Sequence, residues 1–355
     1  MMALTAQLTR PLRRGTRELR AGMVNSRIVP LGRQLPAWRR GFYADHSLIY
    51  DFDRHGFDVY VSDLQRATRF ESLNAERERN LLNDKLVTFL FLRHVGTPTP
   101  TVHGSVSGGH LVGRAIGGES PDLHELLRQR GRLVTKPRGG SGGVRFCLLE
   151  HRDGKVMVNG HEETDIGACL RSDVIVSDFV EQHDYARDIY PEATNTLRIL
   201  ALRDPSTSEP YVAFAMHKFG TDRSKPVDNT SKGGLSAQID VSTGALGALA
   251  ALPGYNFAGP GRVVWADHHP STGARVTGVA VPHWDAVTSG ILGLMRAMSG
   301  SHCVGWDVVV TPDGFSVIEG NNRPEVYHLQ VHRPLLVDAR IRQFFEHHRV
   351  IRPGG

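Results

Sequence analysis

The fold of this chain is decided by the stretch GWDVVVTPDGFSVIEGN, residues 305–321. The stretch predicts two strands, Val304 to Thr311 and Phe315 to Glu319, joined by a Pro-Asp-Gly turn. Asp307 opens one apolar strand and Glu319 closes the other, so the hairpin should carry both carboxylates at one end. Two carboxylates in an apolar sheet repel each other unless a cation or a proton compensates their charge.

A divalent cation would satisfy this pair of carboxylates. Mg²⁺ prefers oxygen ligands and commonly takes one or two carboxylates together with substrate phosphates. Asn321 lies two residues beyond Glu319, on the same strand face, and adds a neutral carbonyl oxygen. We therefore expect Asp307, Glu319 and Asn321 to hold Mg²⁺, or Mn²⁺ in its place. The alternative is that the two acids are strand-end residues that face solvent.

A glycine-rich turn, residues 137–143, separates two β-type segments, Arg132 to Lys136 and Val144 to Glu150. Its four glycines within five positions allow backbone N–H groups to converge on phosphate oxygens, and Lys136 adds a positive charge. The turn matches neither G-x-G-x-x-G before a helix nor the P-loop motif, because a strand follows it. It predicts a flap over phosphates, although glycine-rich hairpin turns are also common without that role.

Two further polar segments are candidates for a site. Asn195-Thr196-Leu197-Arg198 puts a guanidinium inside an apolar strand, and a buried arginine needs an anionic partner. A substrate phosphate or carboxylate would serve, as would a structural acid such as Asp178 or Glu181. The loop from Gly220 to Gly234 is long and polar, and loops of that length are usually functional or disordered.

The remaining pattern alternates helices with hairpins and predicts an α+β fold around mainly antiparallel sheets. Before Lys85, the sequence offers only Phe57 to Val61 as a clear strand. The other expected elements are a single helix over Ala75 to His94, a hairpin over Thr101 to Arg114, helices over Asp122 to Arg130, Trp284 to Met298 and Pro334 to His347, and strands over Val174 to Glu181, Thr196 to Leu202 and Tyr211 to His217.

The charge of the chain is concentrated at its amino-terminal end. Met1 to Arg40 holds nine arginines with Glu18 as the only acid, and the whole chain of 355 residues has a net charge of +5. Such an arm could touch anionic lipid or nucleic acid, or serve in targeting. We prefer an amphipathic helix around Arg13 to Val24 that packs on the body, and expect no nucleic-acid partner, because no aromatic platform is interleaved. No apolar run approaches the length of a membrane span.

The three cysteines, Cys147, Cys169 and Cys303, make neither a CxxC pair nor an even disulfide framework. We expect each to be an isolated core cysteine in a reducing cytoplasm. The histidines form no zinc signature, but a general base could be among His94, His183, His217, His268, His269 and His302.

Taken together in their order, these motifs resemble the ATP-grasp enzymes. The features that carry the resemblance are Lys85, the exit Gly96-Thr-Pro-Thr-Pro100, Lys136 with its glycine turn, and the set Asp307, Glu319 and Asn321. Three segments, Asn195 to Arg198, Val227-Asp228-Asn229 with Gly233-Gly234, and Ile318 to Asn321, look like the branch associated with sugar transfer. The resemblance covers about Ala75 to Val331.

The resemblance implies an ATP-grasp fold with two α+β subdomains that clamp ATP and a reduced amino-terminal region. The implied parts are a basic arm over 1–40, a reduced subdomain over 41–80 and an ATP-grasp domain over 81–350. Within that domain, the lid subdomain spans about 100–180 and the carboxy-terminal subdomain about 181–350.

The resemblance also implies roles for individual residues. Arg198 and Lys218 would neutralise the charge on the transferring phosphoryl group or acyl phosphate, although Lys218 stands where relatives often carry arginine. The metal set is Asp307, Glu319 and Asn321, as above. The hinge over 178–181 would read adenine through its backbone, with Glu181 a candidate for the ribose. The nucleotide-contacting set is Lys85, Lys136, Gly139, Gly140, Ser141, Gly142, Gly143, Asp178, Val180, Glu181 and Asn229.

The activity that follows is a Mg-ATP-dependent carboxylate–amine ligase that works through an acyl phosphate, in polysaccharide or secondary-metabolite assembly. One alternative is a kinase that phosphorylates a hydroxyl of a sugar-like acceptor, and another is a non-catalytic nucleotide-binding partner. We expect a small-molecule or glycan-related acceptor, bordered by Gly220 to Gly234 and Gly254 to His269. A homo-oligomer and peripheral membrane contact through the arm are both compatible with the sequence.

Overall fold

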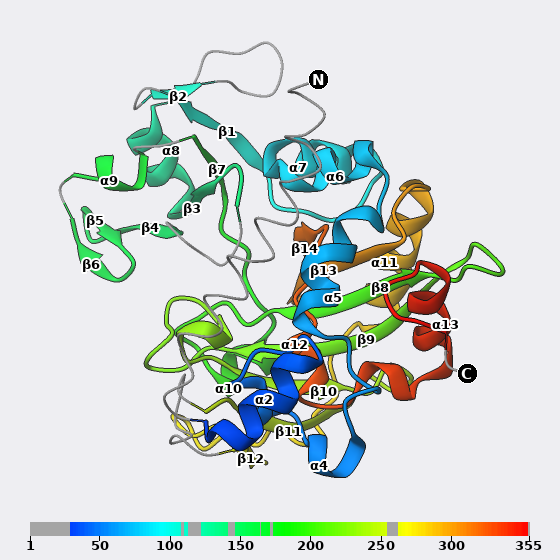
Figure 1. Ribbon diagram of the computed structural model, residues 1–355. Coiled ribbons are helices and arrows are strands. Elements are labelled where there is room, and N and C mark those ends of the chain that lie inside the picture. The colour runs from blue at the N-terminus through cyan, green and yellow to red at the C-terminus, as the bar shows by residue number, and fades with distance from the viewer. Residues whose placement is uncertain are drawn as a thin grey trace, which may run out of the picture.

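The computed structural model describes residues 29–107, 110–112, 122–140, 146–163, 165–170, 173–253 and 262–353. Expectations for Ser141, Gly142 and Gly143, for the arm before residue 29 and for residues 254–261 lie outside this part of the chain. Within it, the helices and strands form two antiparallel sheets with helices packed on them (Figure 1).

The first sheet belongs to the lid subdomain, at the upper left of Figure 1, and has the order β2-β1-β7-β3-β4-β5-β6. Helices α8 (Leu123–Arg130) and α9 (Gly167–Leu170) supply Leu127 and Leu170 to its core, which also contains Leu133, Leu149 and Val176. Its strands are β1 (Val102–Ser107), β2 (His110–Val112), β3 (Arg132–Pro137), β4 (Cys147–Arg152), β5 (Lys155–Val158), β6 (His161–Glu162) and β7 (Val174–Asp178).

The second sheet has the order β12-β11-β10-β9-β8-β13-β14, and every neighbouring pair in it is antiparallel. The sheet is the scaffold of the larger part of the molecule. Its strands are β8 (Leu197–Arg203), β9 (Pro210–Phe219), β10 (Leu235–Ile239), β11 (Leu246–Ala251), β12 (Val264–Ala266), β13 (Cys303–Thr311) and β14 (Gly314–Asn321).

Helices cover both faces of the second sheet, and strand β8 shows why. Leu197 and Ile199 pack with α7 and α11 on one face, whereas Leu200 and Leu202 pack with α13 on the other. Because both faces are buried, residues 197–202 of this strand are apolar with the exception of Arg198. The helices outside the lid are α2 (Leu31–Arg39), α3 (His46–Ile49), α4 (Phe52–His55), α5 (Asp63–Arg69), α6 (Glu76–Asn83), α7 (Lys85–His94), α10 (Asp184–Ile189), α11 (Trp284–Ala297), α12 (Tyr327–Gln330) and α13 (Ala339–His347), with 3₁₀ turns η2 (Phe70–Ser72), η3 (Thr230–Lys232) and η4 (Leu335–Val337).

The predicted single helix over Ala75 to His94 is wrong, because two helices, α6 and α7, meet at Asp84. Asp84 has an extended backbone, and its side chain accepts hydrogen bonds from the N–H groups of Leu86 at 3.0 Å and Val87 at 3.3 Å. Aspartate is a strong N-cap because its carboxylate satisfies donors that a helix start leaves open. The apolar periodicity continues across the break and hides it.

The predicted strand over Phe57 to Val61 is also wrong, since these residues form turns between α4 and α5. Phe57 stacks on Phe52 at a centroid distance of 4.1 Å, and Tyr60 stacks on Tyr50 at 4.6 Å. The alternating aromatic pattern therefore reflects a small core among helices. The preceding helix α2 buries Ala37 against this same core.

The remaining expected elements are present, with shifted ends. The two hairpins of the lid and the β13–β14 hairpin pair as expected, and the strand expected over Val174 to Glu181 ends at Asp178. The last helix begins at Ala339 rather than Pro334, because Asp338 caps it after the 3₁₀ turn η4. No helix in the described part of the chain has the length and apolar character needed to cross a membrane.

The expectation of three isolated cysteines is wrong for two of them. Cys147 on β4 and Cys169 on α9 form a disulfide with a Cα–Cα distance of 6.1 Å, inside the apolar core of the lid. The pairing joins residues 22 positions apart, so no local motif announces it. Cys303 is a free thiol on β13, and burial raises its pKa.

This pairing predicts a definite pattern of thiol alkylation. In protein purified without reductant, iodoacetamide should add one group per chain in denaturant, and three after reduction. The native protein should take none, because Cys303 is fully buried. Intact-mass spectrometry measures the number of adducts per chain. Cys303→Ser should remove the one adduct that forms in denaturant without reduction. Three adducts in denaturant without reduction would show that Cys147 and Cys169 are unpaired.

Candidate functional site

A cavity of about 620 Å³ opens where the two sheets face each other. Both sheets contribute to its wall, and so do the loop after β9 and the segment after β14. Its lining includes Lys85, Lys136, Gly139, Gly140, Asp178, Val180, Arg198, Lys218, Asn229, Asp307, Glu319 and Asn321. These are the candidate site residues that the structure describes, with the exception of Glu181.

Strand pairing explains why the charged residues meet. Arg198 on β8 lies directly opposite Asp307 on β13, and Asp307 lies opposite Glu319 on β14. Met216 of β9 lies opposite Arg198, so Lys218, two residues on, has the same face. Residues opposite each other in antiparallel strands share a face. The sheet therefore presents the charges of four neighbouring strands, β9, β8, β13 and β14, to the cavity.

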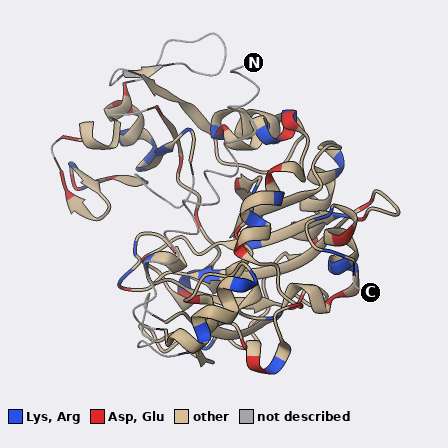
Figure 2. Ribbon diagram, viewed as in Figure 1, with Lys and Arg blue, Asp and Glu red and all other residues tan. Residues whose placement is uncertain are grey.

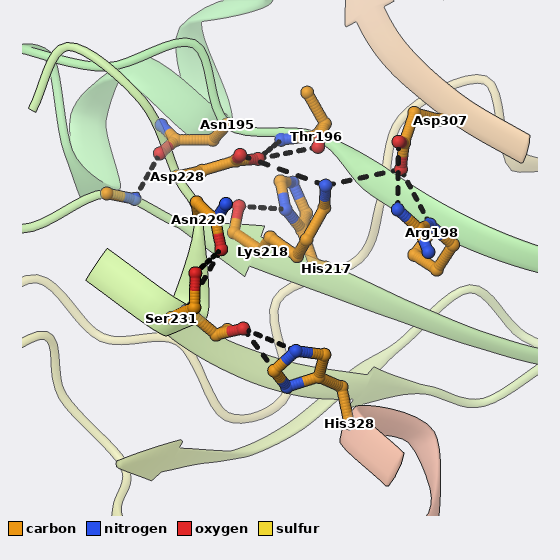
Figure 3. Close-up of polar contacts among 12 residues, drawn as sticks. Asn195, Thr196, Arg198, His217, Lys218, Asp228, Asn229, Ser231, Asp307 and His328 are labelled. Carbon is orange, nitrogen blue, oxygen red and sulfur yellow. Dashed lines mark hydrogen bonds and ion pairs between the residues drawn. The ribbon is translucent and has the colours of Figure 1, made fainter. Parts of the chain in front are cut away.

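Arg198 and Asp307 form a buried, two-pronged ion pair. The Arg198 Nε donates to Asp307 Oδ1 at 2.8 Å, and its second guanidinium nitrogen donates to Oδ2 at 2.9 Å (Figure 3). Gly305 permits this approach, since a Cβ there would lie 2.7 Å from Pro324 and 3.5 Å from Cδ of Arg198. The anionic partner that the sequence left open is thus Asp307, rather than Asp178 or Glu181.

Lys218 adds a second cation to the same carboxylate. Its Nζ lies 3.2 Å from Asp307 Oδ1 and 3.8 Å from Asp228 Oδ1, so Lys218 stands between the two acids (Figure 3). Burial alone would raise the pKa of Asp307, but Arg198 and Lys218 hold that pKa well below its usual range. Burial likewise opposes the charged form of Arg198, yet Asp307 raises its pKa. Both shifts favour the charged forms of Asp307 and Arg198.

Two further lysines of the cavity lining, Lys85 and Lys136, form contacts between the two subdomains. The Lys85 Nζ lies 3.2 Å from Glu319 Oε1 and donates to the Gly140 carbonyl of the glycine turn at 2.5 Å. The Lys136 Nζ donates to the Ile318 carbonyl at 3.1 Å and lies over the ring of Phe89. Burial lowers the pKa of Lys136 to about 8, and nearby Lys85 adds to this effect against the attraction of Glu319.

The base of the glycine turn is held by the start of α7. Arg138 contacts both carboxylate oxygens of Asp84 through its Nε, at 2.9 Å each, and the Lys85 N–H donates to the Arg138 carbonyl at 2.9 Å. Gly140 has φ of +93°, which favours glycine. The helix break at Asp84 thus positions both the turn and Lys85.

The residues of the predicted hinge, which begins at the end of β7, face two different surfaces. Asp178 and Val180 line the cavity, and Asp178 binds His103 at 2.6 Å. Glu181 instead forms an ion pair with Arg132 in a separate groove behind the hinge. Glu181 does not line the cavity in this structure, and its expected contact with the ribose stays a prediction. The chain leaves the strand at Asp178, so strand alternation no longer predicts where Glu181 points.

Asn195 and Thr196 are supports for the loop between β9 and β10. The Asn195 amide donates to the Ala186 and Tyr190 carbonyls at 2.9 and 2.7 Å, and its oxygen accepts the Gly220 N–H at 2.9 Å. Thr196 donates its N–H and hydroxyl to Asp228 Oδ2, at 2.8 and 2.5 Å. The loop is thus held at both ends and is ordered, with η3 inside it.

Several cavity residues had no predicted role. Asp228 belongs to the motif Val227-Asp228-Asn229, but the sequence assigns it no function. The other residues come from α5 and from the segment after β14, and they are Arg66, Arg323, Glu325, Tyr327 and His328. The run Arg323-Pro324-Glu325 directly follows the hairpin, and its charges were a signal that could have been used. The contribution of α5 had no local signal, because it depends on the tertiary fold.

The candidate histidines and one candidate segment lie elsewhere. None of the six histidines named as a candidate general base lines the cavity, whereas His328 does. Burial lowers the pKa of His328 well below its usual range. In the segment expected to border the acceptor, Arg262, Val263 and Trp265 line a different cavity of about 590 Å³ beside α2 to α4.

The donor set at the charged wall fits Mg²⁺ chemically. Asp307, Glu319 and Asn321 offer oxygen ligands, and Mg²⁺ usually completes its shell with water and substrate phosphates. Within the described residues, no cluster of three or more His, Cys, Asp or Glu side chains is placed to bind a metal ion. The Asn321 amide donates to Asp307 Oδ2 at 3.3 Å, so it must turn to present its oxygen.

The net charge of the cavity lining favours an anionic ligand. Six lysine and arginine side chains line it against five carboxylates. Figure 2 shows that lysine, arginine, aspartate and glutamate residues occur on both parts of the molecule. Converging cations in a low-dielectric cleft raise the local concentration of anions.

Two α+β parts with a cavity between their sheets, lined by lysine and arginine side chains from both, are the arrangement of the ATP-grasp fold. The model of the sugar-transfer associated ATP-grasp family matches residues 65–343, and the chain belongs to this family. No curated protein matches the chain.

Solved structures with a similar fold include three enzymes of low sequence identity. N5-carboxyaminoimidazole ribonucleotide synthetase from Thermotoga maritima is 15% identical, with 83% of this chain and 62% of that chain covered and a TM-score of 0.39. Biotin carboxylase from Campylobacter jejuni is 12% identical, with 86% and 51% covered and a TM-score of 0.45. D-alanine–D-alanine ligase from Bacillus anthracis is 13% identical, with 81% and 77% covered and a TM-score of 0.42. The chain thus spans less than two thirds of the first of these.

The buried ion pair predicts a strongly non-additive effect on stability. Asp307→Leu should lower the free energy of unfolding by about 3–5 kcal/mol, because it leaves Arg198 buried without its anion. Arg198→Met combined with Asp307→Leu should recover most of this loss. Urea denaturation followed by tryptophan fluorescence measures each value.

The exposed pair Arg296–Glu209, at 3.1 Å with both side chains more than half exposed, is the matched control for this cycle. Its single and double apolar variants should change stability by less than about 1 kcal/mol. If the loss in free energy of unfolding in the double variant at 198 and 307 equals the sum of the losses in the two single variants, the pair does not act as a unit.

Proposed function

We propose that this protein is a Mg-ATP-dependent carboxylate–amine ligase. The observation that carries the proposal is the wall formed by Arg198, Lys218, Asp307 and Glu319. It lies in one cavity with Gly139 and Gly140 of the glycine turn and with a second polar set, Asp228, Glu325 and His328, which we call the far pocket. A site for phosphoryl transfer to an acceptor needs cations around the transferring group and an open space on its far side. The cavity has both.

In this proposal Lys85 and Lys136 hold ATP phosphates beneath the glycine turn, and Val180 belongs to the adenine end. Asp307, Glu319 and Asn321 would hold Mg²⁺, which neutralises charge on the phosphates and acts as a Lewis acid. Arg198 and Lys218 lie where they can stabilise the charge of the transferring phosphoryl group. Asn229, on the loop beside Asp228, completes the proposed nucleotide contacts.

The chemistry of the far pocket suits a small polar acceptor. A substrate carboxylate would attack the γ-phosphate of ATP, and an amine would then capture the acyl phosphate as ADP and phosphate leave. The lid would exclude water from this hydrolysable intermediate. Two further expectations, assembly of a polysaccharide or secondary metabolite and a cytoplasmic location, stay predictions. The disulfide Cys147–Cys169 argues against a reducing compartment such as the cytoplasm.

The test of the activity is a product screen with a matched pair of variants. Purified protein is incubated with ATP, Mg²⁺ and mixtures of amino acids, short peptides, uronic acids and amino sugars, and ADP, phosphate and product mass are read together. Glu319→Gln should abolish product formation and keep the fold, because it removes a charge from the proposed metal set. Glu209→Gln, on an exposed ion pair, should leave turnover unchanged.

Each outcome of the screen has a definite meaning. Amide products with equal ADP and phosphate support a ligase, whereas phosphorylated acceptors without free phosphate would replace it with a kinase. Full turnover in Glu319→Gln would remove that residue from the site. ATP binding without any product would favour a non-catalytic nucleotide-binding role.

The pKa of Lys136 predicts how ATP binding depends on pH. Because burial lowers this pKa to about 8, Lys136 is charged below that pH and loses its charge above it. ATP affinity should therefore fall as pH rises from about 7 to about 10, by up to about tenfold per unit above the pKa. Isothermal titration calorimetry with Mg-ATP measures the dissociation constant.

Lys136→Arg is the control for this prediction, because guanidinium stays protonated over the whole range. Its affinity should be nearly independent of pH. A wild-type affinity that is equally flat would show that Lys136 does not contact the phosphates.

A further inference from the structure

Asp228 is a buried carboxylate on the cavity wall to which the proposed nucleotide contacts give no role. It lies on the loop between β9 and β10, is 7% exposed and lines the same cavity as Arg198 and Lys218. Burying a carboxylate is costly unless it is compensated. Its contacts therefore need a separate account.

The two oxygens of Asp228 differ in their surroundings. Oδ2 accepts hydrogen bonds from the Thr196 N–H at 2.8 Å and the Thr196 hydroxyl at 2.5 Å. For Oδ1, the described residues supply the Lys218 Nζ at 3.8 Å, which is beyond hydrogen-bond range. One oxygen is thus fixed to the protein, and the other is open to a group inside the cavity.

The backbone around Asp228 is held rigidly. Val227 forms a parallel bridge with Thr194, and the Thr221 hydroxyl donates to the Gly233 carbonyl at 2.9 Å, which closes the loop. Gly234 packs so tightly that a Cβ there would lie 2.4 Å from the Asp228 carbonyl oxygen. The open oxygen therefore has a defined position, as a catalytic group requires.

The other ionisable groups that face this space are less suited to accept a proton. Asp307 is bound by Arg198 and Lys218, and Glu319 by Lys85. Burial also raises the pKa of Glu325, but its carboxylate is already paired with the Arg66 guanidinium. Burial makes His328 a weak base, as described above, whereas burial raises the pKa of Asp228 despite the opposing effect of Lys218.

We infer that Asp228 is the catalytic base that binds the acceptor ammonium group and takes its proton. The inference rests on the proposed ligase function and adds the acceptor class to it: a primary amine that is protonated in solution. Lys218, the neighbour that the described residues supply to the open oxygen, favours the carboxylate form of Asp228 and so opposes the effect of burial on its pKa.

The step balances as follows. The acceptor R–NH₃⁺ gives one proton to Asp228 Oδ1 and becomes a neutral amine. Its nitrogen lone pair attacks the acyl carbon, the C–N bond forms and the C–O bond to phosphate breaks. The second proton of the nitrogen passes to the departing phosphate, and Asp228 later releases its proton to solvent.

Hydroxylamine separates this role from a structural one. It is a nitrogen nucleophile that is unprotonated at neutral pH, so it can capture an acyl phosphate without a base. Asp228→Asn keeps an oxygen for the two Thr196 donors but removes the carboxylate. The protein is incubated with a mixture of the twenty free amino acids, ATP and Mg²⁺, with and without hydroxylamine. Mass spectrometry then measures the amounts of amide and hydroxamate products.

Asp228→Asn should lower amide formation by about 100-fold or more, the usual contribution of a general base, and leave hydroxamate formation nearly unchanged. Asp222→Asn is the matched control, because Asp222 lies on the same loop, contacts the Tyr190 hydroxyl and is absent from the cavity lining. It should change neither product.

Two results would overturn the inference alone: a proportional loss of amide and hydroxamate in Asp228→Asn, or an amide-specific loss in Glu325→Gln instead. A wild-type protein that forms neither product would overturn the ligase proposal, and this inference with it. If Asp228→Asn does not fold, Thr196→Val takes its place, since it keeps the carboxylate but removes the hydroxyl that fixes Oδ2. It should lower amide formation about tenfold more than hydroxamate formation, and equal losses would contradict the assignment.

Discussion

The Arg198–Asp307 ion pair is the constraint on which the arrangement of the site depends. A buried carboxylate and a buried guanidinium are each costly, and together they persist because two short hydrogen bonds and the nearby Lys218 compensate them. The pair requires register between β8 and β13, and it requires Gly305 beside it. A slip of one residue would turn both charges into the apolar core on the other face of the sheet.

The same electrostatic logic joins the two subdomains. Lys85 contacts Glu319 of the second sheet and the glycine turn of the first, and Lys136 reaches from β3 to the Ile318 carbonyl of β14. Both lysines thus use their positive charge on protein oxygens that lie on opposite sides of the cavity. An anionic ligand would compete for these ammonium groups. If ATP phosphates bind there as proposed, their binding and the relative position of the lid would be coupled through the same side chains.

Strand periodicity made a large part of the site predictable. Asp307, Glu319, Asn321 and Arg198 interrupt apolar runs at positions where alternation decides which face they share, and pairing then brings them together. The features that the sequence did not predict depend on contacts between distant segments. The break at Asp84 is invisible in the hydrophobic pattern, and the Cys147–Cys169 pairing needs the fold of the lid. Glu181 points away because it lies beyond the end of its strand.

The two halves of the cavity differ in how they are built, and this difference explains what can be read from sequence. The phosphate end is formed by strand positions and by the start of α7, where backbone geometry determines side-chain direction. The acceptor end is formed by Asp228 on a loop, by Arg66 on α5 and by the segment after β14. Loops carry specificity on a rigid scaffold because they can change without disturbing the core. Thr196 connects the halves, since it immediately precedes β8 and holds the loop carboxylate through its N–H and hydroxyl. If the acceptor binds at Asp228 as proposed, its chemistry would depend on one strand-end residue that orients a loop residue, a relation that spacing in the sequence does not reveal.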